Sequence, residues 1–159
     1  MADIPIDGKV RVSAVPAIAD ISAPTTTELN AGILLQSTMT ADGLIGFQPD
    51  TAAVDTSSLA STFNTSTVGR TSFSNMMLRI KKQTGTDTAH NTLVRGYEFF
   101  VVLRRYVDEA DAWASSDDVQ VYPAICGETK DLDPEPNSLG RYEVPIFLTS
   151  EPDLRSVVA

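Results

Sequence analysis

Apolar and polar residues alternate with a period of two along several short stretches of the chain, which is the pattern of strands with one buried face. The alternation is clear over Lys9–Val15, Asn75–Lys82, Val119–Tyr122 and Tyr142–Leu148, and a further strand is expected over Ile33–Met39. Helical periodicity is scarce by comparison. The pattern therefore predicts a mainly β chain.

Three details refine the expected strands. Tyr97–Val107 contains the unbroken apolar run Phe99–Leu103, which is typical of a central strand covered on both faces. Pro145 gives its strand no ladder donor, so it favours a sheet edge or a bulge. The dipeptide Asp42-Gly43 is a strong signal for a hairpin turn.

Helical signals are confined to two short segments. Residues 87–96 predict a short helix, with Asp87 as the N-cap and Gly96 just past the C-terminus. Pro24–Gly32 is typical of a turn, or of one helical turn closed by Gly32. About six strands with one short flanking helix predict a single β-sandwich or barrel-like domain over residues 1–159.

The connector over residues 44–74 has no clear pattern. Twelve of the twenty-four residues in 51–74 are Ser or Thr. A structureless loop this long is rare in a compact domain and is usually functional or ordered by a partner. A flexible insertion is the simpler interpretation, but the connector carries sparse apolar residues that it could bury, and we predict an arm that docks on a neighbouring subunit. The expected anchors are Val54, Leu59, Phe63, Val68 and Phe73.

Charge is unevenly distributed along the 159 residues. Twelve basic and 21 acidic side chains give a formal net charge of −9, and the apolar fraction of 42% favours a folded core. Residues 1–107 hold nine acids and nine bases, whereas residues 108–159 hold twelve acids and three bases. Such a surface argues against binding to a phosphate backbone or to an anionic membrane. The distribution predicts either a solvated acidic surface that keeps the protein soluble, or a single negative face that serves the function.

Few residues could support catalysis or metal binding. Cys126 and His90 are the single cysteine and the single histidine, which leaves no disulfide and no Cys/His zinc site. No phosphate-binding, dinucleotide-binding or nucleophile-elbow motif is present. We expect no enzyme activity and no cofactor. The N-terminus lacks the features of a secretory signal and no apolar run is long enough to span a membrane, so a reducing, aqueous compartment is expected.

Three weaker possibilities remain. Asp131, Asp133 and Glu135 resemble the start of a calcium loop, but Pro136 stands where that loop needs glycine, so a solvated turn is favoured. Trp113 could stack on a sugar together with Tyr106, although a tryptophan that pins a loop onto the sheet is the more common arrangement. His90 could serve as the base of an enzyme, but it is more often a capping or surface residue, and Cys126 is expected to behave as a small buried hydrophobe.

The order of short motifs along nearly the whole chain resembles the tail tube, or major tail, proteins of long non-contractile-tailed bacteriophages, particularly those of actinobacteria. The matching stretches are Lys9–Val12, Val15–Asp20, Ala23–Leu29, Ala31-Gly32, Asp42–Leu44, Asp55–Leu59, Asn91–Gly96, Val119–Pro123, Cys126–Glu128, Glu143–Pro145 and Thr149–Pro152.

The resemblance implies a β-sandwich with a flanking helix that assembles as hexameric rings stacked into a hollow tube. Residues 44–74 would be the bridging loop, and residues 1–8 and 150–159 the terminal arms. The implied partners are further copies of the chain, the tail tip, the tail terminator and the tape-measure protein, with assembly in the host cytoplasm and a final place in the virion tail.

A tube that conducts double-stranded DNA should not hold phosphates, because each basic contact retains the duplex. We therefore expect an acidic lumen that DNA passes without specific binding. The candidate lumen acids are Asp108, Glu109, Asp117, Asp118, Glu128, Asp131 and Asp133. Two alternatives stay open: a head decoration or tail-completion protein, and a carbohydrate-binding β-sandwich.

Overall fold

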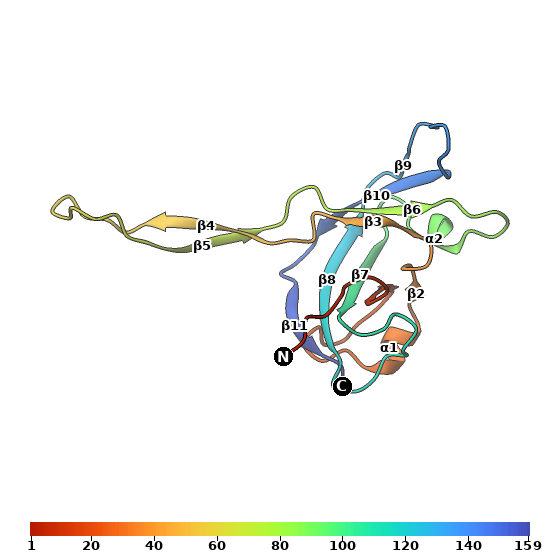
Figure 1. Ribbon diagram of the computed structural model, residues 1–159, viewed down its shortest axis with the longest axis horizontal. Coiled ribbons are helices and arrows are strands. Elements are labelled where there is room, and N and C mark those ends of the chain that lie inside the picture. The colour runs from red at the N-terminus through yellow and green to blue at the C-terminus, as the bar shows by residue number, and fades with distance from the viewer.

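The computed structural model describes all 159 residues, which form eleven strands and two short helices (Figure 1). The prediction of a mainly β, barrel-like fold is confirmed, because the strands build a curled sheet that forms a half-barrel. The elements in chain order are β1 (Val10–Val15), α1 (Thr26–Asn30), β2 (Ile33–Leu34), β3 (Met39–Ile45), β4 (Asp50–Asp55), β5 (Ser66–Ser72), β6 (Met77–Lys81), α2 (Thr88–Thr92), β7 (Glu98–Arg105), β8 (Asp118–Cys126), β9 (Lys130–Asp131), β10 (Arg141–Leu148) and β11 (Asp153–Val157).

The large sheet is antiparallel and runs in the order β2-β1-β7-β8-β10-β6-β3, with β11 added to β8 and β9 to β10. Strand β10 changes partner part-way along: Arg141–Pro145 pair with β6, and Ile146–Leu148 pair with β8. Pro145 lies at this change of partner and in an interior strand, so the sheet edge, one of its two expected positions, is wrong. The missing proline donor is tolerated because the ladder is interrupted there.

Buried side chains pack on both faces of the sheet. On β7, Phe99, Val101 and Leu103 point into the main core inside the curl, whereas Val102 belongs to a second cluster on the outer face. Helix α1 contributes Leu29 to that outer cluster. The prediction that this strand is covered on both sides is confirmed.

Local signals explain both helices. Helix α1 is the single turn expected before Gly32, and it begins with a capping box in which Thr25 and Glu28 bond each other's backbone N–H. Helix α2 begins where Asp87 accepts the backbone N–H of His90 at 3.1 Å. It ends at Thr92, before the predicted limit, and so covers one turn of the expected segment.

The segment around Asp42-Gly43 differs from the prediction. The strand expected over Ile33–Met39 is divided between β2 and the start of β3, and Asp42-Gly43 lies inside β3 rather than at a turn. Between the pairs Met39↔Ile80 and Leu44↔Leu78, β3 advances five residues while β6 advances two, which is a bulge. A Cβ on Gly43 would lie only 2.7 Å from the carbonyl of Arg79, so glycine serves a close backbone approach.

Candidate assembly surface

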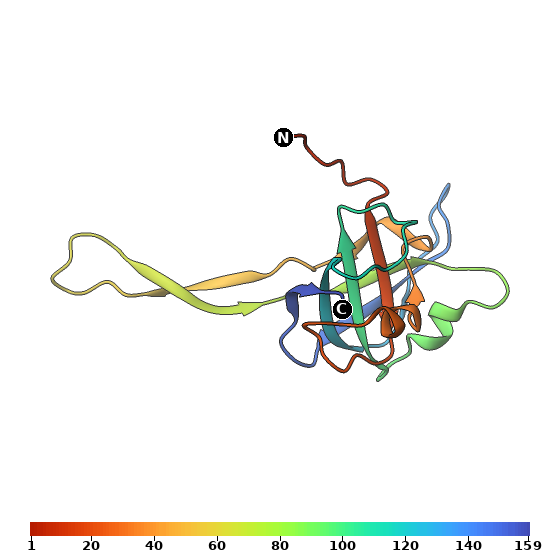
Figure 2. The same cartoon turned by 90° about the horizontal axis from the view of Figure 1, so that it is seen from below.

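The connector between β3 and β6 is a projecting β-hairpin, not the structureless loop that the sequence suggested. Strands β4 and β5 pair only with each other, from Asp50↔Ser72 to Asp55↔Ser66. Both views show this hairpin reaching far from the rest of the chain (Figures 1 and 2). All six residues of β4 are exposed.

Hydroxyl groups organise the tip of the hairpin. The Ser57 hydroxyl donates to the Thr65 carbonyl at 3.3 Å and accepts the Thr65 N–H at 2.9 Å, while the hydroxyls of Thr56 and Thr65 lie 2.9 Å apart. The Ser61 hydroxyl donates to the carbonyl of Phe63 at 2.7 Å. The Ser/Thr-rich composition therefore satisfies the backbone of a segment that has no neighbouring strand.

The root of the hairpin is anchored in the main core by aromatic side chains. Phe47, before β4, and Phe73, after β5, both contact Tyr122 edge-on, with ring centroids 5.2 and 5.7 Å away. The two chain segments leave the body at Gly46 and Asn75, which have φ angles of 76° and 53°. A side chain at Gly46 would collide with the backbone of Ser74 and Asn75. These contacts fix the direction in which the hairpin projects.

Four of the five predicted anchors lie exposed on the hairpin: Val54 at 49%, Leu59 fully, Phe63 at 75% and Val68 at 80%. Phe73 differs, because it is half-buried against the subunit's own core. Exposure of this much apolar surface on a thin projection is typical of a segment that is covered by a partner.

The candidate lumen acids form two separate groups. Strand β8 has nine residues and so spans about 30 Å at roughly 3.3 Å per residue. The structure therefore does not bring the seven carboxylates together, because they lie at opposite ends of this strand. Asp108, Glu109, Asp117 and Asp118 precede it or begin it, and Glu128, Asp131 and Asp133 follow it.

The acidic segment before β8 is held by a buried arginine that the sequence did not single out. Arg104 is 1% exposed and donates to the carbonyls of Asp108, Asp111 and Ala112 at 2.9, 2.6 and 2.9 Å. Its guanidinium also pairs with the carboxylate of Asp117 at 2.9 Å. Among the candidate acids, Asp117 thus has its charge compensated within its own subunit.

Trp113 completes this anchoring. Its ring is 6% exposed, and the guanidinium groups of Arg11 and Arg104 lie over it at 5.0 and 5.3 Å from its centroid. Arg11 donates to the carbonyls of Glu109 and Asp111 at 2.8 and 2.9 Å. Trp113 therefore pins the loop onto the sheet as predicted, and it offers no open face for a sugar, whereas Tyr106 is exposed.

The remaining reactive side chains have structural surroundings. His90 contacts Tyr142 edge-on at 4.9 Å. Burial raises the pKa of the Cys126 thiol to about 12. Burial of Asp87 opposes its ionisation, but the backbone N–H groups of Gln83 and His90 outweigh this effect and hold its pKa below the ordinary value.

Neither a metal cluster nor a membrane-spanning helix is found. No group of three or more His, Cys, Asp or Glu side chains is placed to hold a metal ion. The calcium-like turn around Asp131 and Asp133 is exposed. Neither helix has the length and apolar character needed to cross a bilayer.

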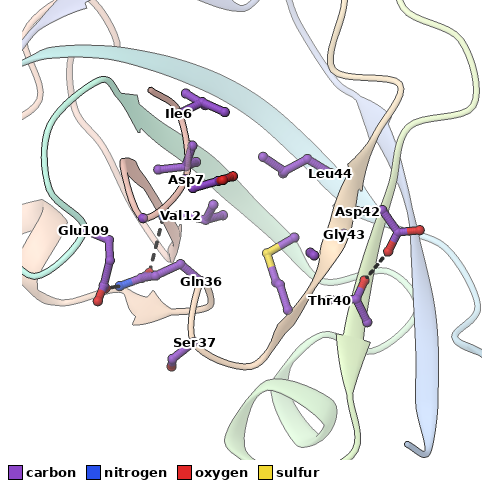
Figure 3. A pocket seen from close by; sticks show the side chains of 14 residues that line it. Ile6, Asp7, Val12, Gln36, Ser37, Thr40, Asp42, Gly43, Leu44 and Glu109 are labelled. Atoms are coloured by element: carbon purple, nitrogen blue, oxygen red, sulfur yellow. Dashed lines mark hydrogen bonds between the residues drawn. The ribbon is translucent and has the colours of Figure 1, made fainter. Parts of the chain in front are cut away.

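A pocket of about 460 Å³ lies at the open side of the half-barrel, between the N-terminal segment and β3 (Figure 3). Its apolar lining includes Val12, Met39 and Leu44. Gln36 spans the pocket edge, because its side chain accepts the Val12 N–H at 3.3 Å and donates to the Glu109 carboxylate at 3.2 Å. These two hydrogen bonds of Gln36 thus partly close the open side of the half-barrel within the subunit.

The two chain ends behave differently. Residues 1–8 are exposed and extend away from the body, with Gly8 accepting the Glu109 N–H at 2.9 Å (Figure 2). Residues 150–159, expected as a second arm, instead return to the subunit's own sheet: β11 pairs with β8, and Val158 is buried in the outer cluster. In this subunit the C-terminal segment therefore belongs to the body, because it completes the packing of that face.

Comparison with known protein families shows to which family this chain belongs. The family described as phage tail tube protein matches residues 1–159, the whole chain. The chain belongs to the phage tail tube protein family. This tail tube protein is therefore a structural component of the virion tail, from a family whose members assemble into multi-subunit structures.

A solved structure supports the fold of the tail tube protein independently. A chain described as "Cryo-EM structure of the anti-feeding prophage (AFP) baseplate, 6-fold symmetrised" superposes with a TM-score of 0.59 at 10% identity, covering 96% of each chain. No curated protein matches the sequence. At this identity the likeness establishes a shared fold.

Proposed function

We propose that this tail tube protein polymerises as stacked hexameric rings, and that the resulting tube conducts viral DNA into the host. The observation that carries the proposal is the projecting β4–β5 hairpin, which holds four apolar side chains exposed on a compact body. Rings close through heterologous contacts, in which one surface of a subunit meets a different surface of the next. Sixfold symmetry is supported by the related baseplate chain, whose description names that symmetry.

In this proposal the hairpin bridges to a neighbouring subunit through Val54, Leu59, Phe63 and Val68, and residues 1–8 act as a second, N-terminal arm. Phe73 supports the bridge from its root. Assembly takes place in the host cytoplasm with the tape-measure protein and tail tip, and the terminator protein ends the tube. Extended segments of this kind bury large surfaces on assembly while the free subunit stays separate.

The acidic surplus suits a conduit. A negative lumen repels the DNA backbone from all sides, so the duplex passes without the counterion release that retains a bound polyanion. Asp108, Glu109, Asp118, Glu128, Asp131 and Asp133 are the candidate lumen acids, with Asp117 contributing less because Arg104 pairs with it. A wall lined with arginine and lysine, and these carboxylates on the outside, would contradict this part of the proposal.

Electron microscopy of the concentrated, purified protein tests the assembly directly. We expect sixfold rings or tubes with a central hole wide enough for a duplex of about 20 Å. A variant with Leu59→Ser and Phe63→Ser should not form them, whereas the matched tip variant with Ser58→Ala and Thr62→Ala should. A head decoration protein would form no open tubes. Normal tubes from the Leu59/Phe63 variant would refute the bridging role.

A further inference from the structure

The open side of the half-barrel exposes two strand edges that face one pocket. The large sheet ends at β2 on one side and at β3 on the other. Strand β2 pairs only with Ser13 and Ala14 of β1, so the first part of β1 has no neighbouring strand on that side. The pocket of about 460 Å³ lies between this part of β1 and β3 (Figure 3). An uncovered strand edge is a template for pairing with another chain.

The backbone of β1 directs hydrogen-bonding groups toward this open side. The Val12 carbonyl accepts the Leu35 N–H at 2.9 Å, and the Val12 N–H donates to the Gln36 side-chain oxygen at 3.3 Å. Residues two apart in an antiparallel strand direct their backbone groups to the same edge. The N–H and C=O of Val10 therefore face the same way as those of Val12, beyond the end of β2.

The Gln36 side chain already occupies one position of this edge. Its amide carries a carbonyl oxygen and an NH₂ group, so it presents to Val12 the same acceptor that the peptide group of a neighbouring strand would present. The edge of β1 thus binds an amide where β2 has ended. The next pair of backbone groups along this edge, on Val10, is left for a further chain.

The pocket also brings the main core to the surface. Val12 and Met39 belong to this core, whereas Val10 and Leu44 pack against it and are only partly buried. All four side chains line the pocket. A segment that paired with the β1 edge could place every second side chain on this apolar lining.

The pocket is acidic where it is polar. Its fourteen lining residues include Asp7, Asp42 and Glu109 but no lysine or arginine. Asp42 pairs with Arg79 at 2.7 Å, whereas neither Asp7 nor Glu109 has a salt bridge. Figure 3 shows the Asp7 carboxylate directed toward β3. Charge complementarity therefore favours a basic occupant over another copy of the acidic N-terminal segment.

We propose that this pocket is a docking site for an extended segment of a second protein, in which apolar residues alternate with lysine or arginine. The segment adds to the β1 edge through the backbone of Val10, its apolar side chains cover the exposed part of the core, and its basic side chains reach Asp7 and Glu109. Main-chain bonds supply affinity and the alternate side chains supply specificity in this mode of recognition. The partner differs in kind from the copies of the chain in the proposed function, and the site does not depend on them.

Peptide binding to the full, unassembled chain tests the site. The probe is a fluorescent peptide with blocked ends and the sequence Thr-Val-Lys-Val-Lys-Val-Thr, and its matched control carries glutamate in place of lysine. Fluorescence anisotropy should show saturable binding of the lysine peptide that weakens with added salt, and no binding of the glutamate peptide. Equal binding of the two peptides, or binding of neither, would overturn the proposal. In the second case Gln36 and the acidic side chains would only protect the edge from pairing.

Three single substitutions locate the binding. Asp7→Asn and Glu109→Gln each remove one carboxylate of the pocket and should weaken binding of the lysine peptide by about fivefold, the upper range for an exposed ion pair. Asp133→Asn removes the same charge on an exposed loop that does not line the pocket and should leave the affinity unchanged. An equal loss in all three variants would show attraction by net charge alone and would overturn the docking site.

Backbone methylation distinguishes strand addition from capture of an amine. Two further peptides carry N-methyl groups on alternate amides, one set along each edge of the extended segment. At least one of them should lose binding, because a methylated amide cannot donate to the β1 edge. Binding that survives both methylation patterns and is displaced by 1,5-diaminopentane would show a site for the ammonium group alone, which would overturn strand addition.

Discussion

The hairpin offers a clean separation between folding and assembly, because its root and its tip each carry a phenylalanine in opposite surroundings. Phe47 at the root is 4% exposed and packs on Tyr122, whereas Phe63 at the tip is 75% exposed. Phe47→Ala should therefore destabilise the subunit, and Phe63→Ala should leave its stability unchanged while preventing assembly.

The expected magnitudes follow from burial. Truncation of a fully buried phenylalanine costs about 3–5 kcal/mol, a large part of a typical unfolding free energy of about 5–15 kcal/mol. Phe63 has few contacts to lose, so Phe63→Ala should stay within about 0.5 kcal/mol of the parent. With a urea dependence of about 2 kcal/mol per molar, Phe47→Ala should lower the unfolding midpoint by about 2 M.

The assay is urea unfolding followed by circular dichroism, at a protein concentration where the subunit is unassembled, together with tube formation observed by electron microscopy. The slope with urea should be the same for all three proteins, which makes the midpoints comparable. A destabilisation by Phe63→Ala as large as that by Phe47→Ala would refute the separation. So would efficient tube formation by Phe63→Ala.

Three further substitutions probe other parts of the fold, each measured by urea unfolding. Arg104→Met removes a hydrogen bond to each of three carbonyls and the ion pair with the Asp117 carboxylate, and should cost about 3 kcal/mol or more. Gly46→Ala adds a collision with backbone to its positive φ, so it should cost clearly more than Gly85→Ala, where φ is 77° but no atom lies within 4 Å. Asp87→Ala removes the cap of α2 and should cost about 1 kcal/mol at pH 7. Burial opposes ionisation of Asp87, yet two backbone N–H groups lower its pKa below 3.8, so this stabilisation is complete above about pH 4 and is lost as the pH falls through the lowered pKa. The difference between Asp87→Ala and the parent should therefore shrink toward pH 2.

The sequence was informative where a strand packs against its own subunit. The unbroken run Phe99–Leu103 predicted a strand covered on both faces, and Trp113 was correctly expected to pin a loop. Asp42-Gly43 misled because the dipeptide that forms a tight turn also fits a bulge, and only the partner strand decides between them. Arg104 gave no local signal, since its role depends on carbonyls that the fold brings to it.

The β4–β5 hairpin escaped prediction for a different physical reason. Alternation of apolar and polar residues records one face against the subunit's own core and one against solvent. A ribbon whose two faces meet other copies, or none, has no such asymmetry, and Ala52–Val54 carries no alternation. The absence of a pattern, which allowed a flexible insertion as the simpler interpretation, is therefore what we expect of a strand pair with the proposed role in assembly.

The net charge and the uncharged hairpin have opposite effects on the association of subunits. Each copy carries a net charge of −9, so neighbouring bodies repel one another and the free subunit stays separate. The uncharged stretch between Asp55 and Arg70 is where copies can meet without desolvating a carboxylate. Because Arg104 and Trp113 hold the acidic loop on the body, the repulsive groups are kept away from the contact that we propose for the hairpin. Attraction on a thin projection and repulsion on the body together favour an open, hollow assembly over a compact aggregate.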